Sequence, residues 1–175
     1  CIIGKPNPDF TYGFNTSFRY KRLTLSASFV GSFGNDIYNV QTMMLSNTKQ
    51  YTNNLLREAA LGAWSTSNQT SKWPSIEAFD TDMDLSYASD RFVEDGSYLR
   101  FANLNLSYEV PFKNKDLFIK GLNVGVSGKN LYVWTKYSGW DPDVNSFGSD
   151  IKRMGVDMGS YPSARTFSFD LKFTF

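Results

Sequence analysis

The sequence contains no histidine, which excludes metal sites and general bases that depend on an imidazole side chain. Its 175 residues include a single cysteine, Cys1, so no internal disulfide can form. There is no apolar run long enough for a membrane-spanning helix. Basic and acidic residues nearly balance, 18 against 17, so nothing in the charge indicates a nucleic-acid partner. Aromatic residues, by contrast, are abundant at 17%.

Cys1 leaves two interpretations open. Bacterial lipoproteins begin on a lipidated cysteine, but a flexible polar tether usually follows it. Here the next residues run Ile2-Ile3-Gly4-Lys5-Pro6, which is not such a tether. The simpler interpretation is a free cysteine at the edge of a fragment.

The last stretch, residues 165–175, alternates between two kinds of side chain. Arg165, Phe167, Phe169, Leu171, Phe173 and Phe175 share one face, and Thr166, Ser168, Asp170, Lys172 and Thr174 share the other. Side chains of a β-strand alternate between faces, so this is a strand with an apolar side and a polar side. The apolar side is almost entirely Phe and Leu, and the polar side carries both an acid and a base. This pattern is typical of a transmembrane barrel strand between lipid and a wet lumen.

Four earlier segments alternate in the same way. Strands are predicted at residues 10–20, 23–33, 98–110, 122–134 and 165–175. At roughly 3.3 Å per residue and a tilt near 45°, such strands span on the order of 25 Å, the height of an outer-membrane apolar band. The connections run short, long, short, long, so the long ones, residues 34–96 and 136–164, leave from one rim. One short helix is predicted at residues 54–61.

The predicted fold class is therefore all-β, an antiparallel transmembrane β-barrel segment with long loops. Five strands do not close a barrel, because bacterial single-chain barrels start at about 8 strands. We therefore expect the chain to be a piece of something larger or to pair with other chains. The alternative is a soluble all-β binding or adhesin-like module, which would bury its aromatic faces against a second sheet.

Four spaced motifs resemble, in this order, the C-terminal end of the SusC/RagA family of TonB-linked outer-membrane transporters. They are residues 3–10 (IGKPNPDF), 89–100 (SDRFVEDGSYLR), 127–142 (SGKNLYVWTKYSGWDP) and 157–167 (DMGSYPSARTF). The match extends nearly from end to end of the chain. It is specific, because four motifs would have to coincide.

The resemblance implies the last strands of a barrel of 22 strands, which carries a plug domain and is driven by TonB. It also implies import of oligosaccharides or peptides across the outer membrane of a Gram-negative, Bacteroidetes-type bacterium, with a SusD-like surface lipoprotein as a lid. The plug, the TonB box and most strands are absent from this sequence. The expected partners are thus the remainder of the same transporter, the SusD-like lipoprotein, TonB through the missing N-terminal part, and outer-membrane lipid. Residues 34–96 and 136–164 would be extracellular.

No catalytic constellation is present, so neither an enzyme nor a cofactor is predicted. Asp80, Asp82 and Asp84 alternate like the first half of a calcium-binding loop. The sixth and twelfth positions, however, are Leu85 and Arg91 rather than Gly and Glu. A solvated loop is therefore the stronger interpretation than a metal site.

Four aromatic residues in the predicted extracellular loops are candidate ligand contacts: Trp64, Trp73, Tyr137 and Trp140. Their rings are suited to stacking on a sugar or on a peptide side chain. The alternative is that they pack the loops on each other or on the lid, since aromatic residues dominate interfaces generally.

Five charged residues fall on the polar sides of the predicted strands: Arg19, Glu109, Lys129, Asp170 and Lys172. They are predicted to face the lumen and to shape a polar pathway. The alternative is that they pair with one another or with the plug. Arg100 and Arg165 are expected on the outward face near the extracellular rim, where they suit lipid phosphates or simple solvation.

Overall fold

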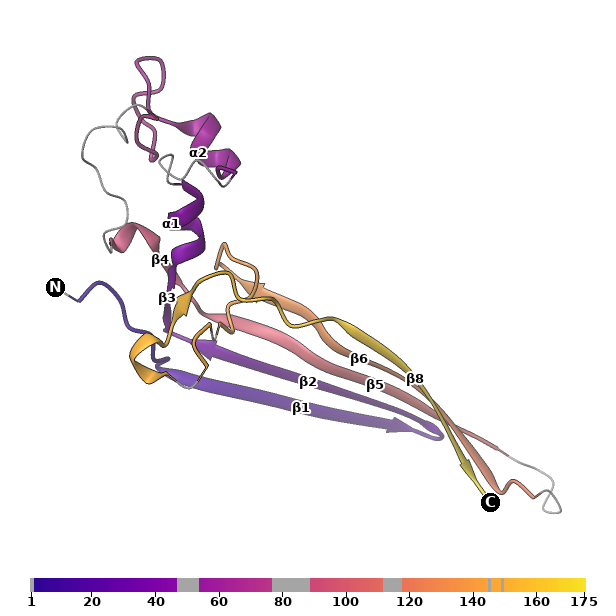
Figure 1. Cartoon of the computed structure of the whole chain (residues 1–175). Coiled ribbons are helices and arrows are strands. Elements are labelled where there is room, and N and C mark those ends of the chain that lie inside the picture. The colour runs from indigo at the N-terminus through magenta and orange to yellow at the C-terminus, as the bar shows by residue number, and fades with distance from the viewer. Residues whose placement is uncertain (1, 47–53, 77–88, 112–117, 145, 149) are drawn as a thin grey trace. The chain divides into compact units, whose positions relative to one another are not determined.

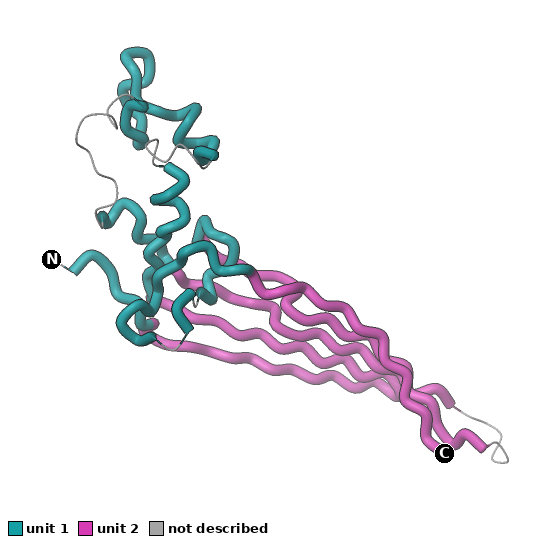
Figure 2. Tube along the Cα trace, viewed as in Figure 1, with its two compact units in different colours: residues 1–7, 35–95, 137–161 teal, residues 8–34, 96–136, 162–175 magenta. Residues whose placement is uncertain are grey.

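The structure, a computed structural model, describes residues 2–46, 54–76, 89–111, 118–144, 146–148 and 150–175. The chain forms two compact units and passes between them repeatedly (Figure 2). We call residues 8–34, 96–136 and 162–175 the sheet unit, and residues 1–7, 35–95 and 137–161 the loop unit. Among the described residues, no helix combines the length and the apolar character needed to cross a membrane.

Five antiparallel strands make up the sheet unit, and each pairs with its neighbour in sequence (Figure 1). They are β1 (Phe10–Tyr20), β2 (Leu23–Phe33), β5 (Tyr98–Val110), β6 (Gly121–Thr135) and β8 (Thr166–Thr174). The bounds of β1, β2 and β5 coincide with the alternating segments of the sequence. The bounds of β6 and β8 differ from them by one residue at each end.

The register gives the sheet one apolar and one polar face. Cross-strand partners lie on the same face of a sheet, so each register row has one chemical character. One row runs Phe18, Leu25, Leu106, Val126 and Phe169, and the next runs Arg19, Thr24, Ser107, Gly125 and Asp170. Phe18 and Phe169 remain 64% and 65% exposed. The apolar face of the sheet unit is therefore left open rather than packed into a core.

A β-bulge at Ala102 interrupts the regular alternation of β5. Asn103 pairs with Ser28, whereas Phe101 pairs with the very next residue of β2, Phe29. One residue of β5 is thus extra, and a bulge of this kind changes which face the following side chains occupy. Phe101 consequently lies on the apolar face and stacks on Phe29, with ring centroids 4.6 Å apart.

The bulge makes the prediction for the start of this strand wrong. Strict alternation puts Tyr98, Arg100 and Ala102 on the apolar side. In the structure Arg100 pairs with Val30 and Val133, on the other face, and only 5% of its surface is exposed. Its guanidinium lies 5.5 Å from the ring centre of Tyr98. Arg100 is therefore not an outward residue at a lipid rim, while Arg165 lies exposed immediately before β8.

The loop unit is built on a small sheet of three short strands that the alternation does not predict. β3 (Asp36–Asn39) pairs with β4 (Val93–Asp95) antiparallel and with β7 (Val156–Asp157) parallel. The unit also contains α1 (Val40–Ser46), α2 (Arg57–Gly62) and the 3-10 turns η2 (Asp90–Phe92) and η3 (Ile151–Arg153). Its apolar core is small, with Ile37 fully buried and Phe92 only 3% exposed. The predicted helix at 54–61 overlaps α2.

Candidate functional site

The apolar face of the sheet unit carries its Tyr and Trp side chains toward the two ends of the strands. Tyr12, Tyr132 and Trp134 lie toward one end, and Tyr20 and Tyr108 lie toward the other. The rows between them hold mainly Phe, Leu and Val. Amphipathic aromatic side chains on both sides of an apolar band are the arrangement found at the two interfaces of a membrane barrel.

The spacing of these aromatic side chains fits the thickness of an outer membrane. Tyr108 pairs with Val124 in β6, ten residues before Trp134 on the same strand. That separation is about 33 Å along the strand, and a tilt of about 40° reduces it to about 25 Å. An apolar band in an outer-membrane barrel is about 25 Å tall.

All five charged residues that are predicted to face the lumen lie on the opposite, polar face. Arg19, Glu109, Lys129, Asp170 and Lys172 occupy the same side as the Ser and Asn rows of the register. Arg19 Nη2 lies 3.6 Å from Glu109 Oε2, and both side chains are more than half exposed. A lumen position for this face stays a prediction.

Short uncharged side chains occupy the middle of the polar face. They line a shallow groove of about 290 Å³, whose polar members include Asn15, Ser17, Ser26, Ser28, Asn103 and Asn105. In this part of the face the residues offer hydrogen bonds without net charge.

A polar network around the buried side chain of Asn39 joins two of the three segments of the loop unit, 35–95 and 137–161, near the end of β3. Asn39, 1% exposed, donates from Nδ2 to Glu94 Oε1 at 2.9 Å and to Ser138 Oγ at 3.3 Å. Asn39 Oδ1 also accepts from the backbone N–H of Thr42 at 2.9 Å, at the start of α1. Ser138 donates from its backbone N–H and its hydroxyl to the two oxygens of Glu94, each at 2.8 Å. The Glu94 carboxylate is thus held by donors from two distant segments.

A second buried contact joins Tyr137 to Asp157. The Tyr137 hydroxyl donates to Asp157 Oδ2 at 2.6 Å, and the backbone N–H groups of Gly159 and Ser160 donate to Oδ1 at 2.9 Å each. Asp157 is fully buried and Tyr137 is 5% exposed. Burial raises the pKa of Tyr137 well above its usual range, and the hydrogen bond to Asp157 and the charges of Asp157 and Glu94 raise it further. The phenol therefore stays protonated as a donor.

These contacts explain why three of the recognised sequence motifs belong together. Glu94 comes from the motif at 89–100, Tyr137 and Ser138 from the motif at 127–142, and Asp157 from the motif at 157–167. Each motif supplies one side of a hydrogen bond to another, and the bond between Tyr137 and Asp157 is buried. In this structure the motif residues thus form hydrogen bonds within and between segments of the loop unit.

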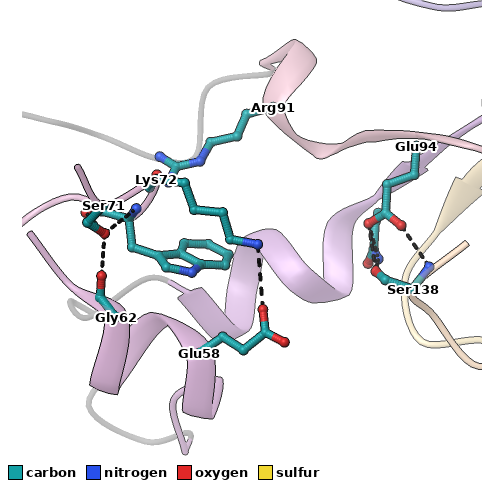
Figure 3. A network of polar contacts seen from close by, with 9 residues as sticks. Glu58, Gly62, Ser71, Lys72, Arg91, Glu94 and Ser138 are labelled. Atoms are coloured by element: carbon teal, nitrogen blue, oxygen red, sulfur yellow. Dashed lines mark hydrogen bonds and ion pairs between the residues drawn. The ribbon is translucent and has the colours of Figure 1, made fainter.

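A cleft of about 470 Å³ lies in the loop unit, and Figure 3 shows several side chains of its lining, Glu58, Lys72 and Arg91 among them. It is lined by Thr42, Leu56, Glu58, Lys72, Trp73, Arg91, Phe92, Glu94 and Ser138. Lys72 Nζ and the Arg91 guanidinium carbon lie 5.1 Å and 5.0 Å from the centre of the Trp73 ring. Arg91 also donates to the backbone carbonyl of Lys72, and Lys72 Nζ lies 3.5 Å from Glu58 Oε2. Burial lowers the pKa of Arg91 from its ordinary value.

The four candidate aromatic residues divide into two kinds. Trp73 and Tyr137 are 8% and 5% exposed, so the packing alternative describes them in this structure. Trp64 and Trp140 are 44% and 70% exposed and stay predicted ligand contacts. Asp80, Asp82 and Asp84 lie outside the described residues. Within the described ranges, no group of three or more His, Cys, Asp or Glu side chains is arranged to hold a metal ion.

Sequence reasoning missed Asn39, Glu94, Ser138 and Asp157 as a connected set. Asn39 carried a usable local signal, since Asn immediately before a helix is a favoured cap, but the short helix α1 was not predicted. For the other three, the signal was their place in the recognised motifs, at points where a short strand or β6 meets a loop.

No protein-family model matches the chain. The chain is 35% identical over 181 residues to the TonB-dependent receptor P3 of Formosa agariphila, a match that covers 99% of this chain and 17% of that protein. It is 29% identical over 184 residues to the TonB-dependent receptor SusC of Bacteroides thetaiotaomicron, covering 99% of this chain and 16% of that protein. The chain is of the SusC/RagA type.

The fold agrees with this assignment. The structure of the RagAB peptide importer in the "closed-closed" state matches with a TM-score of 0.81 at 24% identity, over 99% of this chain and 18% of that chain. The structure of the RagAB peptide transporter matches with a TM-score of 0.77 at 25% identity, over 94% of this chain and 17% of that chain.

This SusC/RagA-type chain therefore has the fold of a partial β-barrel, as its alternation predicts. Its relatives are receptors and transporters rather than enzymes, which confirms the prediction that it is not an enzyme. The chain spans about 17% of the length of the relatives it matches.

Proposed function

We propose that this chain forms part of the wall and outer loops of a TonB-dependent nutrient importer in the outer membrane of a Gram-negative, Bacteroidetes-type bacterium. The observation that carries the proposal is the sheet unit, with an open apolar face between Tyr and Trp side chains and a polar face opposite. Lipid suits the first face and water suits the second. The similarity to TonB-dependent receptors and to RagAB supports the same role.

The imported solutes in this proposal are oligosaccharides or peptides. RagAB, whose fold this chain shares over a segment, is a peptide importer. The plug, the remaining strands and the contact with TonB belong to the part of the relatives' length that this chain does not span. A SusD-like surface lipoprotein is the proposed external partner.

The topology of the sheet unit supports an orientation. Because consecutive strands run in opposite directions, the start of β1, the end of β2, the start of β5, the end of β6 and the start of β8 lie at one end of the sheet. At the other end, a tight turn at Lys21 and Arg22 joins β1 to β2. We assign the first end, from which residues 34–96 and 136–164 depart, to the extracellular side, and the turn end to the periplasm.

The two outer strands of the sheet unit support a larger barrel. Among the described strands, β1 and β8 each pair on one side only. Backbone N–H and C=O groups left unpaired in a bilayer cost several kcal/mol each, so a membrane sheet has to close on further strands. The rest of the transporter would supply those strands.

The soluble alternative requires a cover over the apolar face. Phe14, Phe167 and Phe169 are 61%, 71% and 65% exposed. In a sandwich such rings would be buried against a second sheet. Each ring that stays exposed to water instead forgoes about 1.5–3 kcal/mol of hydrophobic stabilisation. The exposed rings favour the membrane proposal.

A matched pair of substitutions in the full-length protein tests the proposal. Phe169→Arg puts a charge on the apolar face, whereas Ser168→Arg puts the same charge one residue away on the polar face. Near mid-bilayer the first is expected to cost about 2–4 kcal/mol and to reduce the yield of folded protein in the outer membrane. The second is expected to leave that yield near the wild-type value. Equal yields for the two variants would contradict a lipid-facing position.

A further inference from the structure

We propose that the cleft around Trp73 binds a carboxylate group, which Arg91 and Lys72 recognise (Figure 3). The inference rests on the proposed function, since the carboxylate would belong to an imported solute. Two sources share this chemistry, an acidic sugar and an acidic peptide. The experiment below distinguishes them.

The charged side chains that line the cleft differ in whether a partner of opposite charge or a hydrogen-bond donor already contacts them. Glu94 accepts hydrogen bonds from Asn39 and twice from Ser138, so its carboxylate is already occupied. Glu58 lies 3.5 Å from Lys72. Arg91, by contrast, contacts a backbone carbonyl and the rings of Trp73 and Phe92. Among the described residues of this lining, Arg91 is thus the cation without a carboxylate beside it.

Trp73 is a positioning residue in this arrangement. Its indole is 8% exposed and therefore offers no open face for a sugar ring to stack on. Its backbone is fixed, because its N–H donates to Ser71 Oγ at 2.9 Å and its carbonyl accepts from the backbone N–H of Trp64 at 2.9 Å. The two cationic groups lie about equally far from this fixed ring, at 5.0 Å and 5.1 Å. Cation–π attraction thus holds both cations close to the same indole ring.

A carboxylate fits this lining better than a neutral group does. A guanidinium binds a carboxylate through two parallel N–H···O bonds, and an ammonium group adds a third donor. Partial burial of the guanidinium lowers the pKa of Arg91, and the residue stays exposed enough for an anion to reach it. The volume of about 470 Å³ suits one acidic sugar unit or one short acidic peptide.

The test uses the full-length transporter, purified in detergent, and isothermal titration calorimetry with two pairs of probes. The first pair is a disaccharide that ends in glucuronate and the same disaccharide that ends in glucose. The second pair is a tripeptide with a central glutamate and its glutamine analogue, both with blocked ends. We expect the acid of one pair to bind about tenfold more tightly than its neutral analogue, and to lose affinity in high salt. The pair that shows the difference identifies the source of the carboxylate.

The variants assign the effect to the cleft. Arg91→Gln is expected to remove the preference for the acid. Arg91→Lys is expected to keep part of it, because lysine retains the positive charge but lacks the two parallel N–H donors of the guanidinium. Arg57→Gln is the matched control, since Arg57 lies exposed on α2 in the same unit and does not line the cleft. If Arg91→Gln alters tryptophan fluorescence or thermal unfolding, Lys72→Met takes its place, with a reduced preference expected.

Two results would overturn the inference. One is a wild-type protein that binds neither acid more tightly than its neutral analogue. The other is an Arg91→Gln variant, folded by these measurements, that keeps the wild-type preference. Either result leaves the membrane proposal standing, because outer-membrane yield of the Phe169→Arg and Ser168→Arg variants is measured independently of any solute.

Discussion

The sheet unit and the loop unit satisfy their polar groups in different ways. In the sheet unit the backbone ladder pairs the N–H and C=O groups, while the side chains of β1 and β8 are exposed on both faces. In the loop unit polar side chains take part in these hydrogen bonds, and two of them, Asn39 and Asp157, are almost wholly buried. The first unit therefore depends on the kind of side chain on each face, and the second on particular residues.

This difference has a consequence for tolerance to substitution. Exchange of one apolar residue for another on the sheet's apolar face keeps the pattern on which that face depends. Exchange of a buried hydrogen-bonding residue in the loop unit leaves its partners without bonds, and each such group costs about 1–3 kcal/mol. The same mutation should thus have unequal effects in the two units.

Removal of an aspartate from each unit is expected to give the largest contrast. Asp157→Ala removes the acceptor of hydrogen bonds from the Tyr137 hydroxyl and from the N–H groups of Gly159 and Ser160, and we expect a loss of about 3 kcal/mol or more in local stability. Asp170→Ala changes an exposed side chain of the sheet's polar face, and we expect a change within about 0.5 kcal/mol. Hydrogen exchange of backbone amides in residues 137–161 and 162–175 of the full-length protein measures both. Similar losses in the two variants would mean that the units do not differ as described.

The sheet and the loops also differ in how much of them can be predicted from sequence. The alternation of residues 10–20 and 23–33 is a local property with a period of two, so it locates β1 and β2 to the residue. The bulge at Ala102 is not local, since it exists only with respect to the partners Ser28 and Phe29 on another strand. Strict alternation therefore misplaced Arg100.

The hydrogen-bond network of the loop unit cannot be predicted from a local sequence pattern either, because it joins residues that are far apart in the sequence. Asn39 and Ser138 are 99 positions apart, and Glu94 and Ser138 are 44 apart. Strands of two to four residues such as β3 and β7 have too few positions to show a period. The burial of Trp73 and the exposure of Trp140 likewise depend on long-range packing, so residue type alone treated them as equivalent.

A pH titration sharpens the comparison at Tyr137. The pKa of this phenol is raised in the folded protein, so the folded state keeps its proton at a pH where the unfolded state loses it. The contribution of Tyr137 to stability is therefore complete below about pH 10 and falls by about 1.4 kcal/mol per pH unit above it. The opening free energy of the loop unit, compared between wild type and Tyr137→Phe from pH 9 to pH 11, measures this slope. A difference between the two proteins that does not change with pH would show that the phenol is not a buried donor.

The smallest expected difference between paired variants lies in the sheet, opposite the bulge, and it tests whether even this unit has a residue-specific position. Asn130 has a φ of 52°, in the left-handed region, and donates from Nδ2 to the carbonyl of Ala164 at 3.1 Å. In Asn130→Ala the new residue is disfavoured in this left-handed conformation and the hydrogen bond to Ala164 is removed, at an expected cost of about 1–2 kcal/mol. Asn130→Gly loses only the hydrogen bond and should cost about 1 kcal/mol less than alanine. Urea unfolding of the two variants in detergent measures the difference. If glycine is no better than alanine, the backbone conformation is not what selects asparagine, and the sheet unit depends on its facial pattern alone.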